Sequence, residues 1–137
     1  MTIGPLIAFA FALATSSALA GPWQDAQDLI KRGDVARALP LLVQAANAPS
    51  DPNALSAQFA LGCYYEAGTG TKPDFAMAAR WYRRAAESGH SQAQVALASM
   101  LAAGRGVAQD YTEAARWLAA AAAAAARTSA PTGVRPD

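Results

Sequence analysis

The residue types best suited to catalysis are scarce in this 137-residue chain, which has one histidine, His90, and one cysteine, Cys63. A metal site needs several His, Cys or carboxylate ligands at short spacings, and a reactive thiol needs a nearby base or cation. His90 has no such ligand set around it, and no His, Lys or Arg lies near Cys63 in the sequence. We therefore expect His90 to have a structural role in the turn between the repeats and Cys63 to pack as a small apolar residue.

Two glycine loops, at residues 68–70 and 104–106, could cradle phosphate if they followed strands and belonged to a complete phosphate-binding motif. Neither condition is met, so we interpret both loops as turns between helices. Trp81 and Trp117 recur with small residues at the helical period, which favours core packing over ligand binding. The sequence thus predicts a protein without enzymatic activity, cofactor or metal.

The chain repeats itself at a spacing of 36 residues. Residues 57–86, AQFALGCYYEAGTGTKPDFAMAARWYRRAA, overlay residues 93–122, AQVALASMLAAGRGVAQDYTEAARWLAAAA, without a gap, and 14 of the 30 aligned pairs are identical. A period between about 20 and 50 residues is typical of stacked repeats, in which each unit buries its apolar face against its neighbours. We therefore expect function to lie in a binding surface rather than in a catalytic pocket.

Each repeat is predicted to be a pair of antiparallel helices. Alanine, which has the highest helix propensity, accounts for 38 residues, and no segment alternates with a period of two. In the first repeat a helix over residues 57–67 ends at the glycine loop, and Asp74 caps the second helix. In the next repeat Asp110 precedes Glu113 at the spacing of a capping box. We expect Trp81 to be buried between its own hairpin and the next.

A shorter hairpin precedes these two repeats. Residues 23–32 read as a helix, Gly33 breaks it and Asp34 caps a second helix, which ends near Asn47. The segment NAPSDPN that follows favours turn geometry. The predicted fold is all-α, an α-solenoid of three antiparallel helix hairpins. Its expected divisions are a signal peptide at 1–20, a hairpin at 21–48, a linker at 49–53, repeats at 54–90 and 91–126, and a disordered tail at 127–137.

The first 20 residues have the pattern of a secretory signal peptide. A short apolar run is followed by Ala18-Leu19-Ala20, which has small residues at the two positions that a signal peptidase reads. The run is shorter than the ~20 residues that span a bilayer, although an uncleaved anchor is the alternative. We expect cleavage after Ala20, a periplasmic or secreted mature protein and no stable membrane insertion after cleavage.

The charged residues argue against nucleic acid as a partner. The chain has 11 basic and 10 acidic residues, with a net charge of +1 and no run of like charges. The sequence therefore predicts no basic stripe that could bind nucleic acid or an anionic membrane surface.

The two central units resemble the Sel-one-like repeat, a relative of the tetratricopeptide repeat, and the first hairpin is similar to an ordinary tetratricopeptide unit. The residues that carry the resemblance in the first central unit are Leu61, Gly62, Tyr65, Gly68, Gly70, Asp74, Ala78, Trp81, Tyr82, Ala85, Ala86, Gly89 and His90. The second unit departs at two of these positions, with Ala98 for Gly62 and Leu118 for Tyr82. The resemblance implies an adaptor or scaffold for protein or peptide partners, often in the bacterial envelope.

In such stacks the first helices of successive units line a concave face, where a partner could bind. The positions offset from the buried stripe predict a protein-binding groove, made of Trp23, Gln27, Ile30, Phe59, Cys63, Glu66 and Val95. The alternative is that Trp23 covers the open end of the stack and Phe59 packs between units. Arg83 and Arg84 are expected on a solvated face.

The last predicted helix contains eight consecutive alanines, from Ala119 to Ala126, where the preceding unit carries polar residues. Terminal repeats usually have a polar outer face. One interpretation is that alanine has too little apolar surface to require burial. The other is self-association or docking through this helix, which would make the protein a structural assembly element of an envelope complex.

Overall fold

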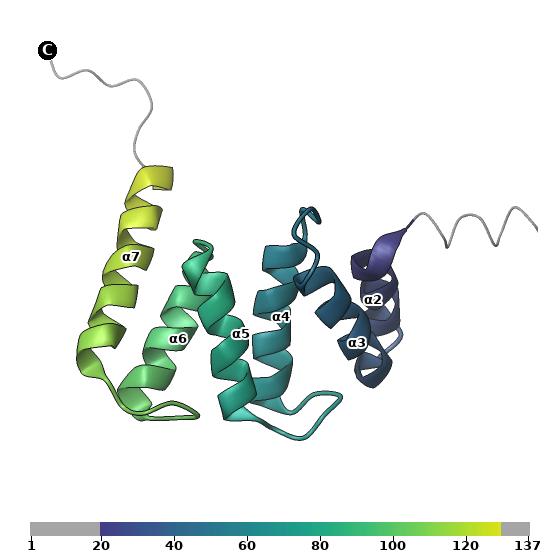
Figure 1. Cartoon of the computed structure of the whole chain (residues 1–137), viewed down its shortest axis with the longest axis horizontal. Coiled ribbons are helices and arrows are strands. Elements are labelled where there is room, and N and C mark those ends of the chain that lie inside the picture. The colour runs from purple at the N-terminus through teal and green to yellow at the C-terminus, as the bar shows by residue number, and fades with distance from the viewer. Residues whose placement is uncertain (1–19, 130–137) are drawn as a thin grey trace, which may run out of the picture.

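The computed structural model describes residues 20–129, and within this range the chain forms six α-helices and no strand (Figure 1). The all-α prediction is therefore confirmed. The helices are α2 (Gly21–Lys31), α3 (Val35–Ala46), α4 (Ala54–Ala67), α5 (Phe75–Glu87), α6 (Ser91–Ala103) and α7 (Tyr111–Ser129).

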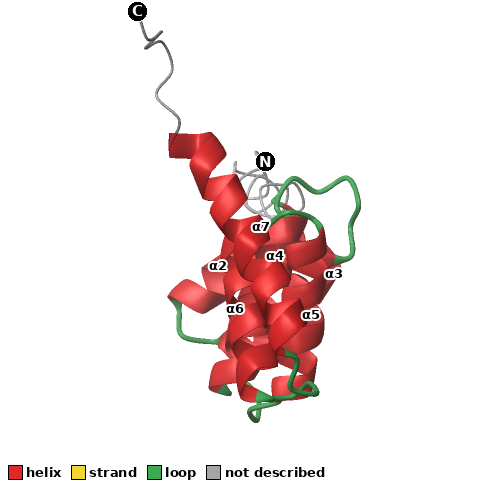
Figure 2. Ribbon diagram, turned by 90° about the vertical axis from the view of Figure 1, so that its left-hand side faces the viewer, coloured by secondary structure: helices red, strands yellow, loops and turns green. Residues whose placement is uncertain are grey.

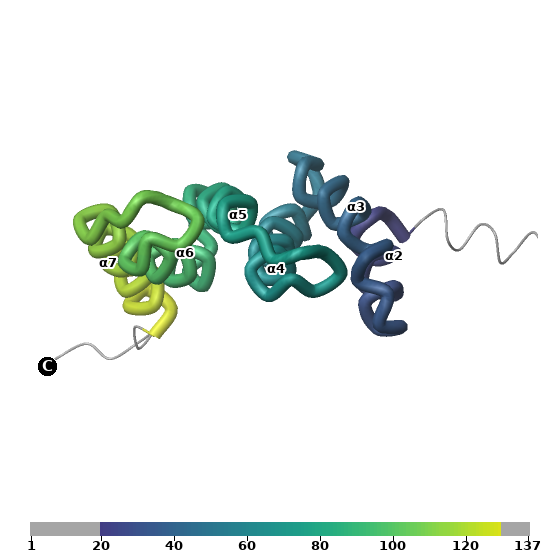
Figure 3. The backbone as a smooth tube through the Cα atoms, turned by 90° about the horizontal axis from the view of Figure 1, so that it is seen from below, coloured from purple at the N-terminus to yellow at the C-terminus, as the bar shows by residue number. Residues whose placement is uncertain are grey.

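The helices pair as three consecutive hairpins, α2 with α3, α4 with α5 and α6 with α7. Each helix packs mainly on the helices next to it in the chain. Figure 1 shows the hairpins side by side in one row, and the view from below in Figure 3 shows the same order from α2 to α7. Seen along the row in Figure 2, the helices overlap in a narrow column with the connecting loops at its two ends. The arrangement is the predicted α-solenoid.

Two apolar clusters form the core. The first joins Ala26 of α2, the inner face of α3, the first turns of α4 and Trp81 of α5. The second joins α5, α6 and the start of α7. Trp81 is 8% exposed and lies in the first cluster, so it packs toward the preceding hairpin. The expectation that it would lie between its own hairpin and the next was wrong, because Tyr82, one position further around α5, takes that place in the second cluster.

Side chains cap four of the helices. Asp34, Asp74 and Asp110 accept the backbone N–H of the third following residue at the starts of α3, α5 and α7. His90 caps α6, because its Nδ1 accepts the N–H of Ala93 at 3.2 Å.

The capping box expected at Asp110 and Glu113 does not close. Asp110 caps the helix as predicted, at 2.9 Å, but its own N–H donates to the carbonyl of Leu101. The Glu113 carboxylate accepts instead from Arg83 and Trp117. Sequence spacing could not reveal the Arg83 donor, because Arg83 comes from another helix.

Each glycine loop connects the two helices of its own hairpin and also packs against the preceding hairpin. Gly68 and Gly104 end α4 and α6 in the left-handed conformation, with φ of 70° and 66°. Gly70 lies against the first residues of α3, and Gly106 lies against the backbone of Phe75 at the start of α5; a Cβ at either position would overlap that backbone. Glycine is therefore required at Gly70 and Gly106 for close approach as well as for positive φ.

Two equivalent glutamines make a second tie between hairpins. Gln58 of α4 donates to the carbonyl of Ala46 at the end of α3, and Gln94 of α6 donates to the carbonyl of Ala86 near the end of α5, each at 3.1 Å. Both glutamines are buried, and their 36-residue spacing places them at matching points of the stack. A buried amide bound in this way fixes how one hairpin sits on the next.

The C-terminal end of the described chain differs from the predicted divisions. Helix α7 continues through Ser129, so residues 127–129 are helical and not part of a disordered tail as expected. The rest of that predicted tail, and the predicted signal peptide apart from Ala20, lie outside the described residues. Among the helices of residues 20–129, none combines the length and the apolar character that a bilayer crossing requires.

Candidate functional site

Three residues of the predicted groove meet around Tyr82. The Tyr82 hydroxyl donates to Oε2 of Glu66 at 2.7 Å and lies 3.5 Å from the Sγ atom of Cys63. The Phe59 ring lies 5.8 Å from the Tyr82 ring and stacks on the His90 ring at 4.6 Å between centroids. Phe59 is half-buried and packs against the second core cluster.

The other predicted groove residues lie on other helices. Trp23 and Ile30 of α2 are half-buried against the first core cluster, and Gln27 lies between them on the same helix. Val95 of α6 is 47% exposed. The structure thus gathers Phe59, Cys63 and Glu66 in one place, and a common binding role for all seven residues stays a prediction.

Burial tunes two groups in this cluster. Burial raises the pKa of Tyr82, and its contacts with Cys63 and Glu66 raise it further, so the hydroxyl remains a donor to Glu66. Burial lowers the pKa of His90, which keeps Nδ1 neutral and able to accept the N–H of Ala93. Arg105 balances the Glu66 carboxylate at 3.6 Å. These groups hold the loops and helices together.

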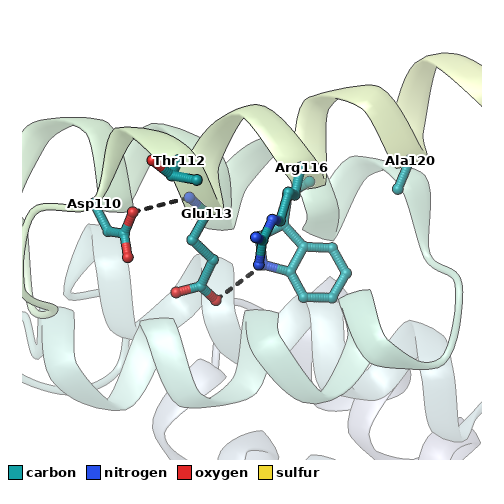
Figure 4. A pocket seen from close by; sticks show the side chains of 6 residues that line it. Asp110, Thr112, Glu113, Arg116 and Ala120 are labelled. Carbon is teal, nitrogen blue, oxygen red and sulfur yellow. Dashed lines mark hydrogen bonds between the residues drawn. The ribbon is translucent and has the colours of Figure 1, made fainter.

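A groove of about 560 Å³ runs along α7 (Figure 4). Its lining residues are Asp110, Thr112, Glu113, Arg116, Trp117 and Ala120. Glu113 is the centre of its polar contacts, since Oε1 accepts from Trp117 Nε1 at 3.2 Å and from Arg83 of the preceding hairpin. The hydrogen bond from Arg83 lowers the pKa of Glu113. The groove therefore combines a half-buried indole, a fixed carboxylate and the exposed side chain of Arg116.

A second groove, of about 360 Å³, lies where the first hairpin meets the first repeat. Arg84 spans it: the guanidinium lies 4.9 Å from the Trp81 ring centroid and donates to Oδ1 of Asn47 at 2.8 Å. Gln58 lines the same groove, and its Oε1 has no hydrogen-bond partner within the described residues. Arg84 is exposed as expected, but it also ties α5 to the end of α3.

The carboxylates of the α7 groove are already hydrogen-bonded within the protein. The Asp110 carboxylate is committed to the N–H of Glu113, and the Glu113 carboxylate to Arg83 and Trp117. Within residues 20–129, no three His, Cys, Asp or Glu side chains are grouped as a metal ion would need. What the α7 groove offers is an aromatic face and an arginine, the residue types that most often anchor protein interfaces.

The fold and these contacts define a class of protein, the α-solenoid built from tetratricopeptide-like helix hairpins. The Sel1 repeat model matches residues 55–90 and 91–125, which together make up more than half of the chain. The chain therefore belongs to the Sel1 repeat family, whose repeats mediate protein interactions. No curated protein sequence matches it.

Two solved structures are similar to this chain. The first is c5321, described as a protective antigen of uropathogenic Escherichia coli strains with an SLR fold, at 32% identity and a TM-score of 0.62. The second is a Sel1 repeat protein from Oxalobacter formigenes, at 29% identity and a TM-score of 0.64. The matches cover 66% and 74% of this chain, but only 19% and 40% of those proteins.

Sequence reasoning missed the α7 groove and the pair of Arg83 and Glu113. Arg83 was expected to be solvated, yet it is half-buried and bridges two hairpins. A signal was present, because Trp117 has Glu113 four residues before it, whereas Trp81 has Met77 there. A carboxylate one helical turn before Trp117 can accept its indole N–H, and the first unit lacks this contact because methionine stands at the matching position.

Proposed function

We propose that this protein is an exported adaptor of the bacterial envelope that binds a protein partner along the α7 groove. The observation that supports this proposal is the combination of Trp117 and Arg116 in a groove of about 560 Å³. Trp and Arg are enriched among the side chains that dominate interface energies. Glu113 fixes the Trp117 indole in place through its Nε1 hydrogen bond, so little side-chain entropy remains to be lost on binding.

Two observations support export and an envelope role. The first 20 residues have the pattern of a cleavable signal peptide. The two similar structures, c5321 and the protein from Oxalobacter formigenes, come from bacteria, and one is described as a protective antigen. The mass of the protein recovered from the envelope fraction tests the first point. A mature chain that begins at Gly21 agrees with the proposal, and retention of Met1 rules out cleavage.

The binding surface is tested with a matched pair of charge reversals. Arg80 and Arg116 occupy the same position in successive repeats, and both are exposed. We expect Arg116→Glu to reduce cross-linking of the mature chain to its envelope partner at least tenfold, and Arg80→Glu to leave it unchanged. Equal loss with both variants, or with neither, rules out the α7 groove as the binding site.

The predicted concave groove is tested in the same experiment. Phe59 is a poor probe, because it packs on Tyr82 and His90 and its removal would also affect folding. Val95 is exposed on α6, so Val95→Asp reports on that surface without disturbing the core. Loss of the partner with Val95→Asp alone would move the site to the predicted groove.

A further inference from the structure

The outer face of α7 matches a face that is buried elsewhere in the stack. On α5, the residues Ala79, Tyr82 and Ala86 are all at most 2% exposed and belong to the cluster shared with α6. The residues 36 positions later on α7 are Ala115, Leu118 and Ala122, and all three are exposed. Helix α7 therefore carries a surface built to receive a helix, and no helix of the described chain covers it (Figure 1).

This surface extends along the whole of α7 as one stripe. Its members are spaced 4, 3, 4, 3 and 4 residues apart, and we call them the α7 stripe: Tyr111, Ala115, Leu118, Ala122, Ala125 and Ser129. This is the spacing of the inner positions of a coiled coil. The charged residues Glu113, Arg116 and Arg127 fall on other sides of the helix.

Apolar exposure is concentrated at this end of the stack. Four large apolar side chains are exposed within the described residues, and three of them, Val95, Tyr111 and Leu118, belong to α6 and α7. An apolar groove of about 370 Å³ adjoins the α7 stripe, and its lining residues are Ser91, Gln92, Val95, Leu118, Ala121, Ala122 and Ala125. In the preceding repeat Phe59 takes the place of Val95, and the His90 ring stacks on Phe59.

We propose that the α7 stripe is the interface of a symmetric dimer, in which α7 of a second copy lies antiparallel along α7 of the first. Residue sizes favour this pairing over a parallel one. An antiparallel pair that is centred on the stripe places Tyr111 opposite Ser129 and Leu118 opposite Ala122, so each large side chain meets a small one. A parallel pair would place Leu118 opposite Leu118 and Tyr111 opposite Tyr111.

The antiparallel direction also agrees with the rest of the stack. Helix α6, which covers the matching face of α5, is joined to α5 by a turn of three residues and runs antiparallel to it (Figure 1). A two-fold axis gives both copies the same contacts and leaves no stripe uncovered. The groove beside Val95 lies next to Ala122 and so receives the Leu118 side chain of the second copy. Because this face lies away from Arg116, the dimer is independent of the proposed partner site.

Sedimentation velocity of the mature full chain tests the dimer. Alanine contributes little apolar area, so we expect a weak dimer with a dissociation constant of ~10–100 µM. Leu118→Asp should convert the protein to monomer, whereas Ala123→Asp, an exposed change outside the α7 stripe, should not. Circular dichroism confirms that both variants keep their helix content. Wild-type protein that remains monomeric at about 300 µM, or equal loss of dimer with both variants, overturns the proposal.

Disulfide trapping tests the orientation. In a Cys63→Ser background, a chain with Leu118→Cys is mixed with a chain with Ala122→Cys and then oxidised. The antiparallel dimer should give mostly the mixed disulfide, because positions 118 and 122 face each other across the two-fold axis. Cross-linking of either chain mainly to itself overturns the antiparallel arrangement. Neither outcome depends on the envelope partner, so the two proposals can fail separately.

Discussion

The ring of Tyr82 on α5 packs directly against the backbone of Gly62 on α4, so closely that a Cβ at Gly62 would overlap the ring. In the second repeat the matching pair is Ala98 on α6 and Leu118 on α7. The larger residue on the first helix thus accompanies the smaller one on the second. We therefore expect the two departures of the second unit from the family pattern, which look independent in the sequence, to compensate each other in size.

This pairing predicts a strong coupling between the two positions. Gly62→Ala alone should destabilise the protein by ~1–3 kcal/mol, because the new methyl group collides with the Tyr82 ring. Adding Tyr82→Leu should recover part of that loss and reproduce the pair found at Ala98 and Leu118. Urea denaturation of the two single variants and the double variant measures the coupling. Simple addition of the two single effects would show that the residues do not constrain each other.

Trp81 should be the side chain whose removal costs most. It is the buried residue of α5 that belongs to the first cluster. Trp81→Ala should cost ~3–5 kcal/mol, the range for a large buried aromatic side chain. Trp117→Ala, the same change in the second repeat, should cost less because Trp117 is only half-buried. Chemical denaturation checks both values, and equal losses would contradict the assignment of Trp81 to the core between hairpins.

The bridge between Arg83 and Glu113 should make stability depend on pH in acid. The Arg83 hydrogen bond lowers the pKa of Glu113, so the ionised carboxylate favours the folded state. This stabilisation is present above the ordinary carboxyl pKa, which is about 4.5, and is lost as the pH falls through the lowered pKa. Both side chains are partly exposed, so the effect should be ~1 kcal/mol or less.

Variants at both positions test this bridge. Thermal unfolding between pH 6 and pH 3 should show a smaller loss of stability in Arg83→Met and Glu113→Gln than in the wild type. Arg80→Met, an exposed change on the same helix, serves as the control and should keep the wild-type slope. An unchanged slope in Arg83→Met would mean that other carboxylates govern the acid transition.

His90 should give a second pH dependence closer to neutrality. Its pKa is lowered by burial, so the unfolded chain binds a proton more readily than the folded one. Stability should therefore be complete above the ordinary histidine pKa of about 6.5 and should decline as the pH falls through the lowered value. Protonation also removes the Nδ1 acceptor that caps α6. Unfolding of His90→Asn, which keeps a capping side chain, should not change between pH 7.5 and 5.5.

The features that follow from local patterns were predictable from the sequence. The 36-residue period and the caps at Asp34, Asp74 and Asp110 led to the correct helix pairs, because each cap acts within one turn of chain. Contacts between hairpins were harder to predict from the sequence. The direction of Trp81 and the partner of Arg83 depend on how far one hairpin rotates on the next, and periodicity alone does not encode that rotation.

The candidate sites illustrate the same limit. Phe59 lies on the same helix as the other residues expected around it, but its packing depends on the ring of His90, which caps the start of α6. The spacing of Glu113 and Trp117 was visible in the sequence, but the α7 groove also depends on Arg83 of the preceding hairpin, which that spacing does not indicate. Residue spacing indicated which side chains share a face of a helix, and the structure was needed to show which faces are covered.

Two kinds of tie between hairpins run from one hairpin back to the hairpin before it. Gln58 and Gln94 reach back to the helix before them, and the loops at Gly70 and Gly106 lie on the start of the previous second helix. Each repeat hairpin therefore supplies the glutamine and the glycine loop that bind it to the preceding hairpin. When the chain emerges from the ribosome or a translocation pore with its N-terminus first, each hairpin can pack on a preceding hairpin that has already emerged. The order in which the chain appears is thus the order in which it can be locked in place.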